Sequence, residues 1–126
     1  MVTKRVREEY RVGERFTTGI ALVDDIFRTV ECPVNAELLP YFHFQSSSGE
    51  IEVISYALSG PMVCCVIDEE FGRNICKLFD VKLTGTVGTI RAIREQHHLQ
   101  SDEIKTIRSK LRASTFYLSD ELLDEL

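Results

Sequence analysis

The sequence predicts an α/β fold in which a small, mostly parallel sheet is flanked by helices. Met62 to Ile67 form an unbroken apolar run that is too short for a helix and is typical of a strand buried on both faces. Segments with the apolar periodicity of amphipathic helices precede and follow this run, and turn residues separate them. We therefore expect helix content well above strand content, in a single domain spanning residues 1–126.

The elements before the central run are predicted from local patterns. Pro33 removes a backbone donor, so the short β-rich stretch around it is assigned to an edge strand. Asn35 is predicted to cap the helix that follows it. In chain order we expect a helix over 3–10, a second helix over 17–28, an edge strand over 30–34, a helix from 36 to 41 or 44, and a helix from 49 to about 58.

The elements after the central run are predicted in the same way. We expect a helix over 70–79, a short strand over 81–83, a helix over 87–96, a helix over 102–113 and a final short helix. Ser101 and Ser119 are the expected N-caps of the last two, because serine hydroxyls accept hydrogen bonds from backbone N–H groups at helix starts.

Composition narrows the classes of function. The net charge of −5 argues against a general polyanion binder, although basic residues gather over Lys4–Arg15 and Arg91–Arg112. There is no apolar run of membrane-spanning length and no apolar segment of a secretory signal, so we expect a cytoplasmic protein without membrane contact. The four cysteines include no C-x-x-C pair, and Cys64 and Cys65 are interpreted as small buried apolar residues on opposite faces of a strand.

Acidic residues follow the central run directly. Asp68, Glu69 and Glu70 stand where a buried strand ends, and ligands of open α/β sheets bind beyond the carboxyl ends of strands. Carboxylate oxygens are the ligands that hard divalent cations prefer. This placement indicates a metal or phosphate site around Asp68. The alternative is that these carboxylates are solvated helix starts, where negative charge is favourable without any chemistry.

Five motifs occur in a fixed order along the chain: VTKRVREEY, GEIEVISYAL, VCCVIDEEFGRNIC, LTGTVGTIRAI and FYLSDELLDEL. In this order they resemble the PIN-domain superfamily, and within it a branch of small prokaryotic proteins related to VapC-type toxins. The resemblance is clearest over Gly49–Leu126 and fainter towards the N-terminus. It implies a three-layer, Rossmann-like α/β sandwich.

The resemblance also implies an activity and its residues. Such proteins are Mg²⁺- or Mn²⁺-dependent endoribonucleases that cut single-stranded RNA, and toxins of this type have an antitoxin-like protein partner. Matched position by position, the implied catalytic residues are Glu9, Glu50 and Asp68, and the implied metal ligands are Glu50, Asp68 and Glu69. Glu52 matches a further family position without a clear role. Candidates for contacts with nucleic acid are Arg73, Thr86, Lys105 and Arg108.

One departure from the family pattern leaves a second function open. Family members open with an apolar central strand that ends in an aspartate, and we expect this strand to be absent here, because no such stretch precedes Val6. An open edge beside the Met62–Ile67 strand would favour pairing with another chain. The alternative function is therefore a catalytically inactive PIN-like remnant that acts as a homo-oligomer or binds a partner protein.

Overall fold

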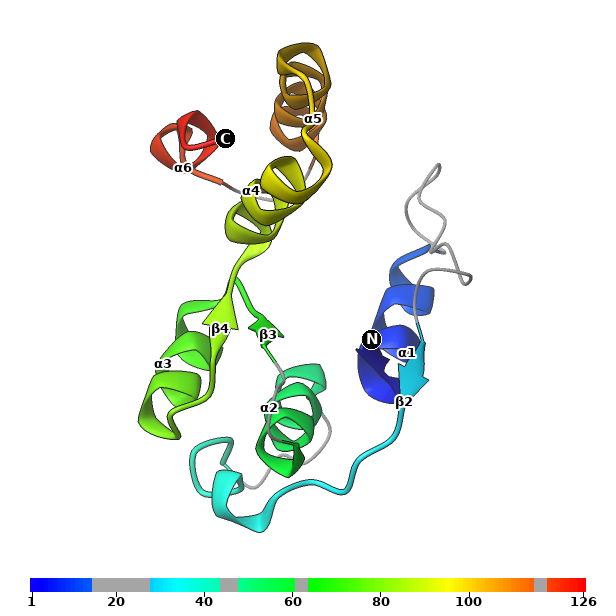
Figure 1. The fold of residues 1–126 in the computed structure, drawn as a ribbon. Helices are drawn as coiled ribbons and strands as arrows, with labels where there is room; N and C mark the ends of the chain where they lie inside the picture. The colour runs from blue at the N-terminus through cyan, green and yellow to red at the C-terminus, as the bar shows by residue number, and fades with distance from the viewer. Residues whose placement is uncertain (15–27, 44–47, 61–63, 115–117) are drawn as a thin grey trace. The chain divides into compact units, whose positions relative to one another are not determined.

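The computed structural model describes residues 1–14, 28–43, 48–60, 64–114 and 118–126 (Figure 1). It divides into two compact units, Met1–Leu83 and Thr84–Leu126, which we describe separately. The single domain expected from the length of the chain stays a prediction. The helix expected over 17–28 lies almost entirely outside the described residues.

The first unit opens with a short strand that the sequence did not reveal. β1 (Val2–Thr3) pairs in parallel with β2 (Thr29–Val30), with Val2 opposite Thr29 and Thr3 opposite Val30. α1 (Lys4–Glu14) follows directly, so the predicted helix begins one residue later than expected. β2 also lies at the start of the predicted edge strand rather than along its whole length. Both differences reflect how little period-2 pattern a two-residue strand contains.

The helix predicted from Ala36 is wrong in type and length. η1 (Ala36–Leu38) is a single 3₁₀ turn followed by turns to residue 43. Pro40 explains the difference, because it has no N–H to donate to the carbonyl of Ala36. The predicted cap is confirmed: the Asn35 side chain accepts a hydrogen bond of 2.9 Å from the Glu37 N–H.

α2 (Gly49–Ser59) is the central helix of the first unit's core. It begins where predicted, and the Ser48 hydroxyl caps it by accepting a hydrogen bond of 3.3 Å from the Ile51 N–H. Ile51 and Ile54 are completely buried, as their spacing on one helix face predicts. Fully burying such a side chain contributes about 1.5–3 kcal/mol. The other completely buried large side chains are Leu38, Cys65 and Cys76.

β3 (Cys65–Val66) corrects the expectation of a strand buried on both faces. Cys65 and Ile67 are buried, whereas Cys64 is exposed and Val66 is 53% exposed. This alternation is that of a strand with one buried face. The two cysteines do point to opposite faces, but the interpretation of Cys64 as buried is wrong.

α3 (Glu70–Leu78) is an amphipathic helix that agrees with its prediction. β4 (Leu83–Thr84) follows, with Leu83 in the first unit and Thr84 in the second. β3 and β4 form a two-stranded sheet, in which the Cys65 N–H donates to the Lys82 carbonyl at 2.9 Å. β4 begins at Leu83, two residues later than the start of the strand predicted over 81–83.

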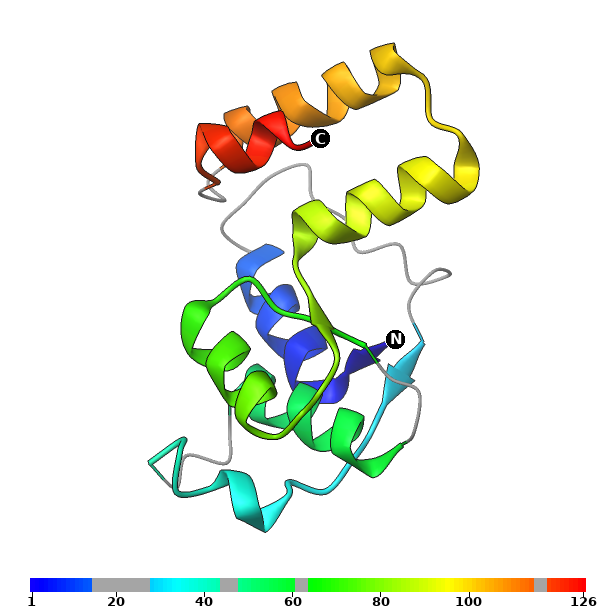
Figure 2. The same cartoon turned by 60° about the vertical axis from the view of Figure 1, so that its left-hand side comes forward.

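The described residues of the second unit form three helices around a core of their own. They are α4 (Thr86–His97), α5 (Ser101–Ala113) and α6 (Asp120–Asp124), and Figure 2 shows the short connection between α4 and α5. The buried residues of this core are Val87, Ile104, Leu123 and Leu126. Ser119 caps α6 as predicted. Ser101 does not cap α5; Gln100 does, through a reciprocal pair of hydrogen bonds with Glu103 that out-competes the serine hydroxyl.

The predicted fold class is confirmed at the level of small parallel sheets flanked by helices in an α/β arrangement. In the described ranges the strands form two separate two-stranded sheets instead of one larger sheet. Within the same ranges, no helix has both the length and the apolar character needed to cross a bilayer.

Candidate active site

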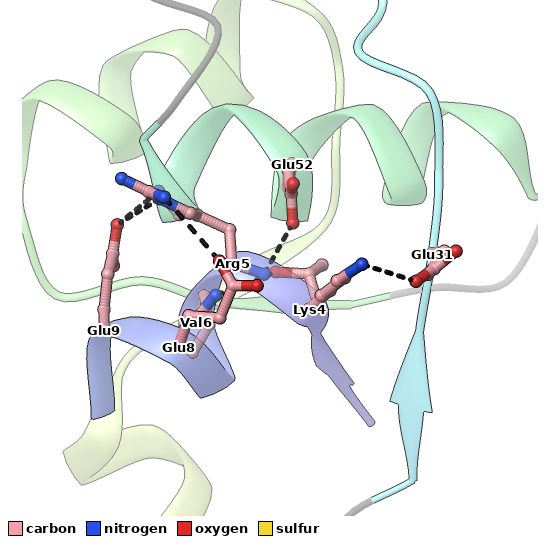
Figure 3. Close-up of polar contacts among 9 residues, drawn as sticks. Lys4, Arg5, Val6, Glu8, Glu9, Glu31 and Glu52 are labelled. Carbon is pink, nitrogen blue, oxygen red and sulfur yellow. Dashed lines mark hydrogen bonds and ion pairs between the residues drawn. The ribbon is translucent and has the colours of Figure 1, made fainter. Parts of the chain in front are cut away.

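Glu9 is held at the start of α2 by two contacts. Its Oε1 atom accepts a hydrogen bond of 3.1 Å from the Gly49 N–H, and the same atom lies 3.5 Å from Nε of Arg5, one helical turn earlier (Figure 3). The side chain of Glu9 is half exposed. A carboxylate at a helix N-terminus is stabilised by the unpaired N–H groups there. Glu9 therefore points from α1 towards the first turn of α2.

Glu50 is the second residue of α2, and one of its oxygens is in an unusual position. Its Oε1 atom is buried and has no hydrogen-bond partner. Burial raises the pKa of this carboxyl group above its usual range, and the negative charges of Glu69 and Glu9 raise it further. Leaving a buried polar oxygen unpaired costs about 1–3 kcal/mol. Glu50 is therefore a carboxylate for which a cation would be a favourable neighbour.

Two glycines make room for these carboxylates. A Cβ atom on Gly49 would lie 2.7 Å from Oε2 of Glu9, and a Cβ atom on Gly72 would lie 2.7 Å from Oε1 of Glu50. Any larger residue at these positions would push the carboxylates away. The Glu50 side chain thus reaches from α2 to the first turn of α3, which brings it towards Glu69.

The acidic segment after β3 leads into α3. Asp68 and Glu69 are exposed, and Glu69 occupies the N-cap position of α3 without a side-chain capping hydrogen bond. Nη1 of Arg73 donates a hydrogen bond of 2.8 Å to the Ile67 carbonyl, which ties the first turn of α3 to the end of β3. The negative charges of Glu69 and Glu9 thus both act on Glu50, and Asp68 precedes Glu69 in the chain. A contact of Arg73 with nucleic acid stays a prediction.

Sequence reasoning missed the connection between α1 and α2 through Arg5 and Glu52. The backbone N–H of Arg5 donates a hydrogen bond of 2.9 Å to Oε2 of Glu52 (Figure 3). The i, i+4 spacing of Arg5 and Glu9 was a signal for their ion pair. No local signal exists for a contact between residues 47 positions apart.

The remaining nucleic-acid candidates lie in the second unit. Thr86 is the first residue of α4. Nζ of Lys105 lies 3.3 Å from Oδ1 of Asp102 on the exposed surface of α5. Arg108 is half buried on the same helix. Their role in binding stays a prediction.

Comparison with protein families identifies the chain. A family described as a PIN domain matches residues 1–126. The chain belongs to the PIN-domain family. The comparisons with curated proteins and with solved structures gave no match. Membership of the PIN-domain family indicates a nuclease-like function in general terms.

PIN domains generally depend on divalent metal ions. The question for this PIN domain is whether its carboxylates are suitable ligands for such an ion. The donor chemistry fits, because Glu9, Glu50 and Glu69 supply carboxylate oxygens and one oxygen of Glu50 is buried and unpartnered. Within the described residues, no three His, Cys, Asp or Glu side chains are grouped closely enough to hold a metal. Mg²⁺ usually keeps several waters and takes one or two carboxylates together with substrate phosphates, so this arrangement still suits it.

The four cysteines of this PIN domain are expected to differ in reactivity. Burial raises the pKa of the Cys65 thiol to about 12 and also raises the pKa of Cys76, whereas Cys64 is exposed and Cys32 is half exposed. The thiolate is the reacting form, so we expect a maleimide at neutral pH to modify Cys64 and Cys32 and to spare Cys65 and Cys76. Peptide mapping by mass spectrometry checks this result. Unfolding in denaturant should expose all four, and early modification of Cys65 would contradict the buried packing of β3.

Proposed function

We propose that this PIN domain is a metal-dependent endoribonuclease that hydrolyses phosphodiester bonds of single-stranded RNA. The observation that supports this function best is the buried, unpartnered Oε1 of Glu50 beside the like charges of Glu9 and Glu69. Carboxylates that repel one another in a partly buried place are destabilising unless a cation offsets them. Carboxylates with raised pKa values are concentrated at sites that bind a cation or move protons.

Each residue has a distinct part in this proposal. Glu50 would hold Mg²⁺ or Mn²⁺ together with Asp68 or Glu69, because these carboxylates come from the start of α2 and the start of α3. Glu9 adds negative charge from α1. Its contacts with Gly49 and Arg5 are made by Oε1 and not by Oε2. A bound divalent ion supplies an activated water and neutralises charge on the phosphate. Without that positive charge, an acidic site would repel a phosphodiester.

Cleavage of a labelled single-stranded RNA tests this function. We expect cutting by the wild-type chain with Mn²⁺ or Mg²⁺, abolished by a chelator. Asp68→Asn should reduce the rate about ten-fold or more, because the loss of a carboxylate weakens a site that has few protein ligands. Glu9→Gln should also reduce it, and Glu8→Gln is its matched control, because Glu8 is exposed and next to Glu9 on α1.

The comparison among variants guards against a contaminating ribonuclease. A contaminant would cut RNA equally in preparations of the wild type, Asp68→Asn and Glu9→Gln. Metal-dependent cutting that falls in both variants but not in Glu8→Gln supports the proposal. Equal rates in all four proteins, or no cutting with either metal, would contradict it.

The alternative function is a partner-binding PIN-like protein without catalysis. It is favoured by one observation, namely that no three-residue metal-binding group is present among the described residues. A relation to VapC-type toxins and an antitoxin-like partner belong to the nuclease proposal, whereas a homo-oligomer or the binding of a partner protein belongs to this alternative. Light scattering at several concentrations with the wild-type chain tests the oligomer directly. A monomer at all concentrations would remove the homo-oligomer from the proposal.

A further inference from the structure

The starts of α1 and α2 are joined by two reciprocal hydrogen bonds. The Gly49 N–H of α2 donates to Oε1 of Glu9 on α1 at 3.1 Å. In the opposite direction, the Arg5 N–H of α1 donates to Oε2 of Glu52 on α2 at 2.9 Å. Each helix therefore supplies a carboxylate that satisfies an N–H group in the first turn of the other, where intrahelical partners are missing. We call this pair of bonds the helix clamp.

The helix clamp fixes α1 against α2 at two points. On α1 the points are Arg5 and Glu9, one helical turn apart, and on α2 they are Gly49 and Glu52, also about one turn apart. With a single bond, only packing would oppose rotation of α1 about that bond. Two bonds separated by a turn oppose both rotation and sliding. Because both acceptors are charged, each bond is stronger than one between neutral groups.

Arg5 joins the two halves of the helix clamp. Its backbone N–H contacts Glu52, while its guanidinium lies 3.5 Å from Glu9 and 3.6 Å from Glu8 (Figure 3). The contact with Glu9 is an ion pair rather than a hydrogen bond, because Nε of Arg5 has no hydrogen-bond partner. A shift of Arg5 on the loss of Glu52 would therefore also shift the charge that holds Glu9.

We propose that Glu52 is a positioning residue, which sets α1 so that Glu9 lies beside Glu50. The inference rests on the proposed nuclease function and extends it to a residue that touches neither metal nor substrate. Outer hydrogen bonds of this kind commonly affect metal affinity, because they orient the carboxylates that bind the ion. If Glu52 only capped α1, its loss would lower the free energy of unfolding and leave the affinity for the metal ion unchanged.

Glu52→Ala and Glu52→Gln, made in the full chain, separate these roles. Glutamine keeps an oxygen that can accept from the Arg5 N–H, whereas alanine removes it. Glu37→Gln is the control for loss of a surface charge in the same unit. Two quantities are measured: the affinity for Mn²⁺ alone by calorimetry, and the hydrogen exchange of the Gly49 amide by NMR.

For Glu52→Ala we expect about ten-fold weaker Mn²⁺ binding and about ten-fold faster exchange at Gly49. The amide of Ile54, in the middle of α2, should keep its rate. Glu52→Gln should stay within about three-fold of the wild type in both measurements. Unchanged Mn²⁺ affinity with a lower melting temperature, or unchanged exchange at Gly49, would overturn the positioning role. Failure of the wild type to bind Mn²⁺ or cut RNA would instead contradict the proposed function, and the exchange at Gly49 would still decide whether Glu52 positions Glu9.

Discussion

Glu50→Gln is expected to lose metal-dependent RNA cleavage by at least about a hundred-fold and at the same time to stabilise the fold. The substitution keeps the shape of the side chain and removes the charge at the place where the Oε1 atom is buried without a partner. The loss of activity follows from the loss of a metal ligand. The gain in stability follows because repulsion from Glu69 and Glu9 disappears.

The stability gain has a definite dependence on pH. The folded-state pKa of Glu50 is raised above 4.5, so protonation favours the native state. The protonated Glu50 therefore contributes to the free energy of unfolding fully below the usual pKa of 4.5, and this contribution is lost as the pH rises through the raised pKa of the folded state. At pH 7 the wild type carries the penalty and Glu50→Gln does not. We expect an increase of about 0.5–1 kcal/mol in the free energy of unfolding, reduced by solvent screening at this partly exposed side chain.

Urea unfolding at pH 4 and pH 7, with RNA cleavage on the same preparations, measures both effects. The difference between variant and wild type should be larger at pH 7 than at pH 4. Glu37→Gln serves as the control, because Glu37 is exposed on the single turn of η1. If Glu50→Gln is less stable than the wild type at pH 7, charge repulsion does not destabilise Glu50. If it still cuts RNA at the wild-type rate, Glu50 is not a metal ligand.

Gly72→Ala is expected to reduce RNA cleavage about a hundred-fold and to lower the free energy of unfolding by about 1–2 kcal/mol. The new methyl group would lie 2.7 Å from Oε1 of Glu50 and 2.9 Å from Cγ2 of Ile67. The Glu50 carboxylate can move, whereas Ile67 is buried, so the carboxylate is displaced. A displacement of about 1 Å can cost about a hundred-fold in rate. The contact with the buried Ile67 stays crowded after the carboxylate moves. Such overpacking costs about 1–3 kcal/mol, which exceeds the gain of about 0.5–1 kcal/mol for alanine over glycine inside a helix.

Asn74→Ala is the matched control for this substitution. Asn74 is exposed on the same helix, so alanine there adds helix propensity without touching Glu50. Thermal unfolding and RNA cleavage are compared for both variants. If Gly72→Ala retains the wild-type rate while folding normally, the space beside Gly72 is not part of the active site.

The order of the elements could be predicted from sequence wherever a pattern extends over several turns. α2 and α3 have apolar residues at helical spacing, and the acids after Ile67 mark the end of a strand. Short features were harder to predict. Pro40 converted an expected helix into one 3₁₀ turn, and the reciprocal bonds between Gln100 and Glu103 took the place expected for Ser101.

The carboxylates themselves could be named from sequence, but their surroundings could not. Family motifs indicated Glu9 and Glu50, and the charges of Glu69 and Glu9 raise the pKa of Glu50 in the structure. The close approach of Glu50 to Gly72 and the bond between Arg5 and Glu52 join residues more than 20 positions apart. Such contacts depend on how helices pack, and no local propensity encodes them.

The separate cores of the two units have a consequence for ligand-dependent stability. The carboxylates and the residues packed beneath them all belong to Met1–Leu83, whereas the core of Val87, Ile104, Leu123 and Leu126 belongs to Thr84–Leu126. A ligand stabilises the part of the protein whose unfolding destroys its site. A divalent ion should therefore slow the opening of the first unit's core amides, because the unfolding of that unit destroys the site.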